Sequence, residues 1–245
     1  MATSHYLRRL LARFYALGGH IHRVHLNSIQ DAVTFLPGPS PRAVIVCAGI
    51  GALHLEGVSD TSVYPTRGHV LLLRAPWCRS GWTRQIGSLG GSEGGARTYI
   101  IPRFNGEVIV GGTREIDDWH KEPRRETTFD ILKRALELCP LLAPPSVRIS
   151  GREPTVDDLL PLIEAEVVGF RPSRKPKGEN DSGLRLEKGL PLSTNDVEVE
   201  VVYNYGHGGF GWQSCWGCAE EVVQLLGGPS APEVGEKFKK AAGLC

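Results

Sequence analysis

The sequence has little net charge and no long hydrophobic run. Its formal net charge is +1, which gives no electrostatic reason to expect DNA, RNA or an anionic membrane surface as a partner. The longest apolar run, AVIVCAGIGAL from Ala43 to Leu53, is far shorter than the about 20 apolar residues that a membrane-spanning helix needs. We therefore expect no nucleic-acid partner and no membrane partner.

The sequence also lacks a disulfide framework and a recognisable metal site. Its six cysteines are scattered and no secretory signal is visible, which favours reduced, mostly buried thiols in an intracellular protein. Cys215 and Cys218 form a CxxC pair near a helix start, where a thiol pKa can be lowered. A zinc site would need a second ligand pair at suitable spacing. We favour packing of small residues as the role of this pair and expect no metal.

The rest of the composition is that of an ordinary globular chain. Its 245 residues suffice for one large domain or two small ones, and 41% of them are hydrophobic, enough for a sizeable core. The first residues predict an amphipathic helix that ends at Gly18 and Gly19, since glycine just past the last periodic residue is a common helix stop. An Arg-rich, acid-poor start is also typical of a mitochondrial presequence, but we favour the ordinary helix.

Beyond this helix, strand and helix patterns mix without a regular alternation. A continuous β-branched run at 43–49 predicts a strand covered on both faces in a parallel sheet, and Asn105-Gly106 predicts a hairpin turn. Further strands are expected at 20–33, 69–74, 164–174 and 197–205, and helices at 127–138 and 213–226. This mixture suggests an α+β module inserted between pieces of an α/β module.

A glycine-rich loop, NYGHGGFGW, runs into the last predicted helix. Glycines leave the backbone unshielded, so a planar ligand or a phosphate can approach closely. The start of the following helix offers free N–H groups and a partial positive charge. A ligand that becomes anionic, such as a reduced flavin, would be stabilised there. The alternative is a turn that needs glycine only for packing, and the pattern alone leaves both open.

Two side chains are placed where they can bind a carboxylate. Arg171 follows the apolar run VVGF, and Pro172 is expected to stop that strand. A planar guanidinium can hold a carboxylate with two parallel hydrogen bonds. Tyr99 begins another strand, and its phenol can donate a hydrogen bond to the same group. The alternatives, an arginine that caps carbonyls and a core tyrosine, stay open.

Four segments in order carry a family resemblance: PTRGH, YIIPRFNGEVIVGGTRE, VGFRPSR with GLRLE, and NYGHGGFGWQSCWGCAEEV. They closely resemble the D-amino-acid oxidase and D-aspartate oxidase family of flavoproteins, in its fungal form. The resemblance runs from Tyr6 to Gly227 and implies a mixed α/β and α+β fold. In that fold, a partial FAD-binding Rossmann-like domain (1–53 and 175–245) carries an inserted antiparallel-sheet substrate-binding domain (54–174).

The resemblance also implies an activity and a set of binding residues. The family oxidises D-amino acids with FAD and oxygen to 2-oxo acids, ammonia and hydrogen peroxide. It needs no dedicated side-chain base, so the protein contributes positioning and electrostatics. The implied substrate-binding residues are Tyr99 and Arg171 at the carboxylate, Gly209 at the amine, and Arg114. The implied cofactor contacts are Leu26, Cys47, Ala48, Gly49, Gly208, Gly209, Phe210, Gly211, Trp212 and Gln213.

Arg114, in the segment GGTRE, bears on the choice of substrate. An arginine in this motif of D-aspartate oxidases helps to hold the side-chain carboxylate, whereas some fungal D-amino-acid oxidases have tyrosine there. A second cation would favour an acidic substrate by charge pairing. The alternative is that Arg114 points outward. We expect a D-amino-acid oxidase in general, with acidic D-amino acids as a candidate substrate class.

The family pattern and this sequence differ at the amino terminus. The family opens with a strand, a G-x-G-x-x-G turn and a helix that cradle the FAD pyrophosphate, and we find no such unit ahead of the first predicted helix. The strands at 44–46 and 198–202 would then lack partners. We expect this polypeptide alone to bind FAD poorly or not at all. The second hypothesis is therefore a truncated, non-catalytic remnant or an interaction module that pairs with a full-length homologue.

The expected partners are a small D-amino acid and oxygen, and a homodimer is left open. The chain does not end in a Ser-Lys-Leu type address. The expected location is intracellular, either the peroxisome that is typical of the family or the cytoplasm.

Overall fold

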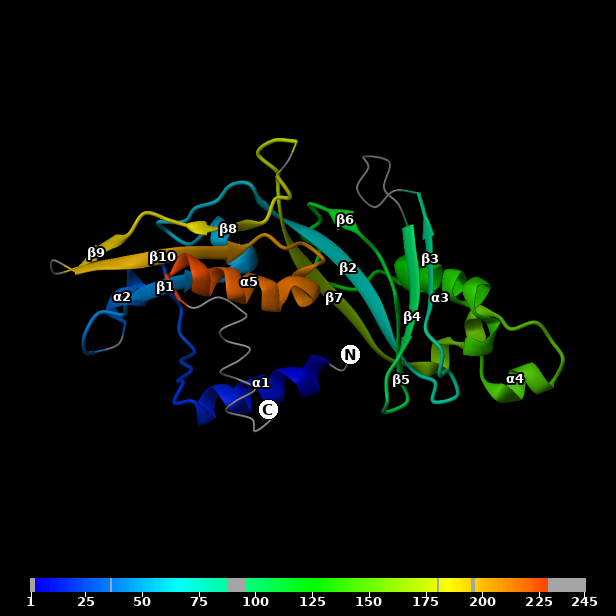
Figure 1. The fold of residues 1–245 in the computed structure, drawn as a ribbon. Coiled ribbons are helices and arrows are strands. Elements are labelled where there is room, and N and C mark those ends of the chain that lie inside the picture. The colour runs from blue at the N-terminus through cyan, green and yellow to red at the C-terminus, as the bar shows by residue number, and fades with distance from the viewer. Residues whose placement is uncertain (1–2, 36, 88–95, 180, 195–196, 229–245) are drawn as a thin grey trace. The chain divides into compact units, whose positions relative to one another are not determined.

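The computed structural model describes residues 3–35, 37–87, 96–179, 181–194 and 197–228, and the chain divides into two compact units (Figure 1). Unit 1 comprises residues 1–23 and 67–170, and unit 2 comprises residues 24–66 and 171–245. Two long strands, β2 (Val63–Arg74) and β7 (Ile163–Arg174), continue from one unit into the other. The domain boundaries predicted after residues 53 and 174, with the roles attached to them, stay a prediction.

Unit 1 is built on a sheet with the strand order β3-β4-β5-β2-β6, in which β7 also pairs with β2. Its further strands are β3 (Trp82–Ile86), β4 (Ala96–Pro102), β5 (Glu107–Gly111) and β6 (Glu115–Ile116). Strand β4 pairs antiparallel with both β3 and β5, and β5 with β2. The predicted hairpin turn between β4 and β5 is confirmed, since Gly106 there has a φ of +86°, a conformation that glycine adopts without strain.

Helix α3 (Arg125–Leu138) provides most of the helical cover of this sheet, and it confirms the helix predicted at 127–138. Its buried side chains follow helical spacing and form one apolar face: Thr128, Ile131, Leu132 and Ala135. They pack with buried sheet residues such as Leu71, Ile100 and Val110. Four short helical segments follow, η2 (Pro140–Leu142), α4 (Pro145–Ile149), η3 (Val156–Asp158) and η4 (Leu160–Leu162), whereas α1 (Thr3–Ala16) precedes the sheet and has no buried residue.

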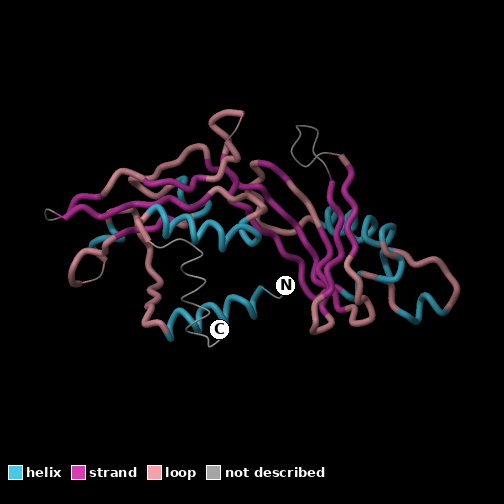
Figure 2. The backbone as a smooth tube through the Cα atoms, in the orientation of Figure 1, coloured by secondary structure: helices cyan, strands magenta, loops and turns pink. Residues whose placement is uncertain are grey.

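Unit 2 has the strand β10 (Val197–Tyr205) at its centre. Strand β1 (Ala43–Val46) pairs parallel with one side of β10, and β8 (Arg185–Lys188) pairs antiparallel with the other. These strands are labelled in Figure 1, and all strands are magenta in Figure 2. The short strand β9 (Leu192–Thr194) pairs with the beginning of β10, and helix α5 (Gly211–Leu225) contacts β8 and β10. The unit also contains α2 (Asp31–Thr34) and η1 (Gly49–Leu53).

Three predictions about elements are wrong. Residues 19–26 have no regular secondary structure, and Ser28 makes only an isolated bridge to Glu56. The alternating residues at 20–33 therefore have no neighbouring strand among the described residues with which to form a sheet. Strand β7 confirms the strand expected at 164–174, but the expectation that Pro172 stops it is wrong, because the Pro172 carbonyl still accepts a hydrogen bond from the Gly208 N–H at 2.9 Å. Strand β1 is not covered on both faces by the described residues, since Ile45 is 47% exposed.

No helix within the described ranges is both long enough and apolar enough to cross a membrane.

Candidate functional site

Three segments that are far apart in the sequence meet in unit 2 beside Arg171. Ser173, near the end of β7, forms an isolated antiparallel bridge with His207 of the glycine loop, and Gly208 bonds to Pro172. The segment after β1 reaches the same place, because a Cβ added to Gly49 would lie 3.7 Å from the Pro172 Cβ. The backbones of β7, the glycine loop and the end of β1 therefore converge.

The glycine loop depends on two positions that need glycine. Gly206 has a φ of +91°, and a Cβ there would lie 2.7 Å from the Gly183 carbonyl oxygen. Gly208 has a φ of +54°. Both values are strained for other residues. Gly209 lies directly against the predicted carboxylate-binding side chain, since its Cβ would be 3.6 Å from the Arg171 Cδ.

Helix α5 begins at Gly211, two residues earlier than predicted. The Gln213 and Ser214 N–H groups donate to the Phe210 carbonyl, which leaves earlier amides at the positive end of the helix. Phe210 and Trp212 are 70% and 46% exposed. The first turn of α5 therefore presents backbone donors and aromatic surface together.

The sequence analysis missed one feature of this loop. Gly206, Gly208 and Gly211 have the G-x-G-x-x-G spacing, and they follow the buried strand β10 and open α5. This spacing is present in the sequence itself, at residues 206–211. A strand, a glycine turn and a helix thus do occur in this chain, at the carboxyl side of unit 2.

The other predicted cofactor residues have different surroundings. Cys47 is exposed and Ala48 is partly buried, and both directly follow β1, next to Gly49. Leu26 is half-buried but lies in the segment without regular structure rather than in the predicted strand.

A buried polar cluster ties the end of β7 to the end of β10. Arg174 Nε donates to Asp60 Oδ2 at 2.7 Å, and the Tyr205 hydroxyl donates to the same oxygen at 2.9 Å. Arg185 Nη1 donates to the Tyr205 hydroxyl oxygen at 2.6 Å. Burial raises the pKa of Tyr205 to about 12, so its hydroxyl keeps the proton that it donates. This cluster fixes Arg174, three residues after Arg171, and Tyr205, which directly precedes the glycine loop.

In unit 1, Tyr99 lies over a pair of glycines. It pairs with Gly111 across the β4–β5 ladder. A Cβ on Gly111 would lie 2.5 Å from the Tyr99 Cζ, and one on Gly112 would lie 2.6 Å from the Tyr99 Oη. The phenol therefore occupies the space that side chains would fill at the end of β5.

Arg114 follows this glycine pair and is exposed. Within the part of the chain that the structure describes, its guanidinium makes no hydrogen bond or ion pair, unlike those of Arg67 and Arg124 close by in the same unit. The predicted alternative, that Arg114 points outward, agrees with this exposure. The same exposure leaves the Arg114 guanidinium accessible to a ligand.

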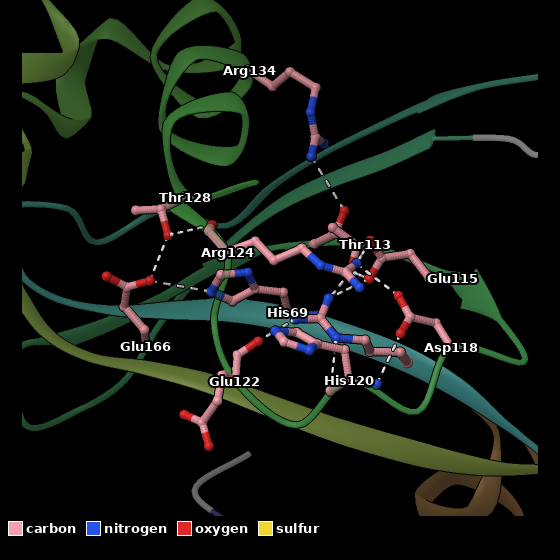
Figure 3. Close-up of polar contacts among 12 residues, drawn as sticks. His69, Thr113, Glu115, Asp118, His120, Glu122, Arg124, Thr128, Arg134 and Glu166 are labelled. Carbon is pink, nitrogen blue, oxygen red and sulfur yellow. Dashed lines mark hydrogen bonds and ion pairs between the residues drawn. The ribbon is translucent and has the colours of Figure 1, made fainter. Parts of the chain in front are cut away.

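Thr113 and Glu115, the neighbours of Arg114 in the sequence, belong to a polar cluster that the sequence alone did not reveal (Figure 3). Arg67 is fully buried and forms an ion pair with Glu115. His69 is also fully buried, with its Nε2 3.4 Å from Glu166 Oε2. Burial lowers the pKa of His69, and the nearby Arg67 charge lowers it further against the opposing Glu166 charge. The imidazole is therefore neutral at neutral pH.

The CxxC pair lies in the first turns of α5. Cys218 is buried, and the Cys215 thiol donates to the Trp212 carbonyl at 3.4 Å. Both are free thiols. Burial of Cys218 agrees with the packing role favoured for this pair.

Solved structures of two oxidases have a similar fold. Glycine oxidase from Geobacillus kaustophilus superposes with a TM-score of 0.52, at 19% identity, over 79% of this chain and 44% of that chain. L-alpha-glycerophosphate oxidase from Mycoplasma pneumoniae, solved with FAD bound, superposes with a TM-score of 0.50, at 16% identity, over 79% and 44%. This chain therefore shares its fold with parts of these two oxidases.

Sequence comparison then gives the family. The model of the DAO family, FAD dependent oxidoreductase, matches residues 2–225, so the chain belongs to this family. D-aspartate oxidase of Cryptococcus neoformans var. grubii is 50% identical over 92% of this chain and 61% of its own length. D-amino-acid oxidase of Schizosaccharomyces pombe is 36% identical over 91% and 56%. The chain thus spans little more than half the length of these relatives.

Proposed function

We propose that this chain forms the substrate side and part of the flavin side of an enzyme that oxidises D-amino acids to 2-oxo acids, ammonia and hydrogen peroxide. The observation that carries the proposal is the convergence of Arg171, the glycine loop and the end of β1 within unit 2. Membership of the DAO family and relatives that are named D-aspartate oxidase and D-amino-acid oxidase support it.

The residues at this convergence fit a flavin. Cys47, Ala48 and Gly49 after β1, and residues 208–213 at the glycine loop and the start of α5, would hold it. The glycines let a planar ring approach the backbone, and the helix amides suit the negative charge that a reduced flavin carries. FAD bound there would supply the redox chemistry, as the acceptor of the hydride from the substrate Cα and the donor of electrons to oxygen.

The chain's own contribution is orientation of the substrate. Arg171 is proposed to hold the α-carboxylate with two parallel hydrogen bonds, and the adjacent Gly209 carbonyl to accept a hydrogen bond from the amine. That the Tyr99 hydroxyl of unit 1 donates a hydrogen bond to a substrate carboxylate stays a prediction from the family resemblance. Fixing both polar groups of an amino acid sets the direction of its Cα–H bond, and such positioning lowers the barrier without a side-chain base.

A direct test loads the full chain with FAD, removes free flavin, and measures retained flavin absorbance and peroxide release. We expect peroxide with D-aspartate and D-alanine but not with L-alanine. A chain that retains flavin but releases no peroxide with either D-amino acid would contradict the proposal.

Acidic D-amino acids are the proposed substrate class, because Arg114 is exposed and its guanidinium has no ion-pair partner among the residues that the structure describes. In Arg114→Tyr, we expect kcat/KM for D-aspartate to fall about 10-fold or more, since a lost charge pair of ~1.4 kcal/mol corresponds to tenfold. The value for D-alanine should stay within a few-fold. Arg79→Tyr, at another exposed arginine of unit 1, is the control. Unchanged D-aspartate selectivity in Arg114→Tyr would show that Arg114 does not select acidic substrates.

A second candidate function is an interaction module that does not hold FAD by itself. Exposed apolar side chains on α5 and β1 favour it: Trp212 is 46%, Trp216 64% and Ile45 47% exposed. Such surface marks a site that another protein segment can cover. If the chain retains no flavin, but retains it when mixed with a full-length family member, this second function is favoured. A homodimer and a peroxisomal or cytoplasmic location stay predictions.

A further inference from the structure

The two neighbours of Arg114 are both fixed to strand β2. The Thr113 hydroxyl oxygen accepts a hydrogen bond from the His69 backbone N–H at 2.9 Å, and the hydroxyl donates to Glu115 Oε2 at 3.2 Å. Glu115 Oε2 also forms the ion pair with Arg67 (Figure 3). Arg114 is therefore held from both sides.

The buried side chain that holds this segment is Arg67, and each of its three guanidinium nitrogens donates a hydrogen bond. Besides Glu115, Arg67 donates from Nε to the His120 carbonyl and from Nη2 to the Glu122 carbonyl, each at 2.7 Å. Its side chain is 0% exposed. A guanidinium has donors in a rigid planar fork, so one buried arginine fixes three points of the segment between Thr113 and Arg124.

Arg124 adds a second clamp from the start of α3. Its Nη1 lies 3.1 Å from Glu115 Oε1 and 2.7 Å from Asp118 Oδ2. Hydrogen bonding to Arg124 holds the pKa of Asp118 below its ordinary value, so the Asp118 carboxylate is charged at neutral pH. Arg67 and Arg124 are thus paired with Glu115 and Asp118, whereas the Arg114 guanidinium has no ion-pair partner among the described residues.

We propose that the cluster of Arg67, Glu115 and Arg124 is a positioning device that presents Arg114 to the second carboxylate of a dicarboxylate substrate. The inference rests on the proposed function, since it takes the ligand to be an acidic amino acid. A fixed backbone reduces the freedom that Arg114 must lose on binding, and such preorganisation increases affinity for the group it faces. Glu115 and Thr113 are positioning residues and do not touch the ligand.

The test compares malonate, a dicarboxylate, with propionate, a monocarboxylate, by calorimetric titration of the full chain in the presence of FAD. We expect the wild type to bind malonate more tightly. In Glu115→Gln, malonate affinity should fall about 10-fold while propionate affinity stays within twofold, and hydrogen exchange at 113–116 should become faster. Glu107→Gln is the matched control, because Glu107 is 23% exposed and paired with Arg103, as Glu115 is 29% exposed and paired with Arg67.

A second pair of variants tests the inference independently, in case Glu115→Gln does not fold. Thr113→Val removes the hydroxyl and should show the same loss for malonate alone, whereas Thr113→Ser keeps the hydroxyl and should restore the wild-type ratio. Equal losses for both probes, or unchanged exchange at 113–116 in Glu115→Gln and Thr113→Val, overturn the inference. So does a wild type without preference for malonate. A chain that prefers malonate but oxidises no D-amino acid contradicts the proposed function and supports the positioning role.

Discussion

At the scale of single residues, the close approach of Tyr99 to the end of β5 leads to a stability prediction. A methyl group at Gly111 would overlap the Tyr99 ring, with 2.5 Å between the added Cβ and Cζ. Overpacking of this kind costs about 1–3 kcal/mol. We expect Gly111→Ala to lower the free energy of unfolding by that amount in urea titrations. Gly169→Ala, on β7 with nothing within 4 Å of its Cβ, is the control, and equal midpoints for the two variants would refute the packing argument.

Asp60 gives a prediction for acid pH. Burial alone would raise the pKa of its carboxyl, but hydrogen bonds from Arg174, Tyr205 and the Ser62 N–H outweigh burial and hold the pKa below its ordinary value. A depressed folded-state pKa contributes stability that is present above the unfolded pKa of about 3.9 and is lost as the pH falls through the folded pKa. Between about pH 5 and pH 2, the unfolding free energy of the wild type should therefore fall more steeply than that of Asp60→Asn. Parallel profiles would contradict this, and the exposed Asp157→Asn should follow the wild type.

At the scale of elements, the parts of the site that local patterns encode were predictable. The Asn-Gly pair gave the β4–β5 hairpin, and alternating residues followed by glycines gave β10, the loop and α5. The prediction of a strand at 20–33 was wrong because an alternating pattern forms a strand only where a neighbouring strand offers hydrogen-bonding partners. The expectation that Pro172 stops β7 was wrong for a related reason, since the hydrogen bond from Gly208 to the Pro172 carbonyl is made by a distant segment.

The β10–loop–α5 element predicts opposite effects for two glycine substitutions. Gly206→Ala places a Cβ 2.7 Å from a backbone oxygen at a φ of +91°, so we expect it to destabilise the chain by about 1–3 kcal/mol. Gly217 lies within α5 with open space around its Cβ, so Gly217→Ala should stabilise it by about 0.5–1 kcal/mol. Thermal melts of both variants check the pair, and shifts of the same sign would count against the loop geometry.

At the scale of the whole molecule, the chain consists of two units with separate cores. The resemblance of four short segments identified the family, because glycine and arginine positions around a flavin leave strong local signals. No comparable local signal in the sequence predicts the polar cluster around Arg67. It depends on β2 meeting the segment 113–124, more than forty residues later in the chain, and only tertiary pairing brings those charges together.

The most direct test of the account measures flavin reduction without oxygen. The full chain is loaded with FAD, and D-aspartate or L-aspartate is added while flavin absorbance is followed. We expect D-aspartate alone to bleach the flavin. Arg171→Leu should require roughly 30-fold more D-aspartate or worse, because losing a charged bidentate contact costs about 2–5 kcal/mol. Equal bleaching by both enantiomers, or an Arg171→Leu variant that responds like the wild type, would contradict the account.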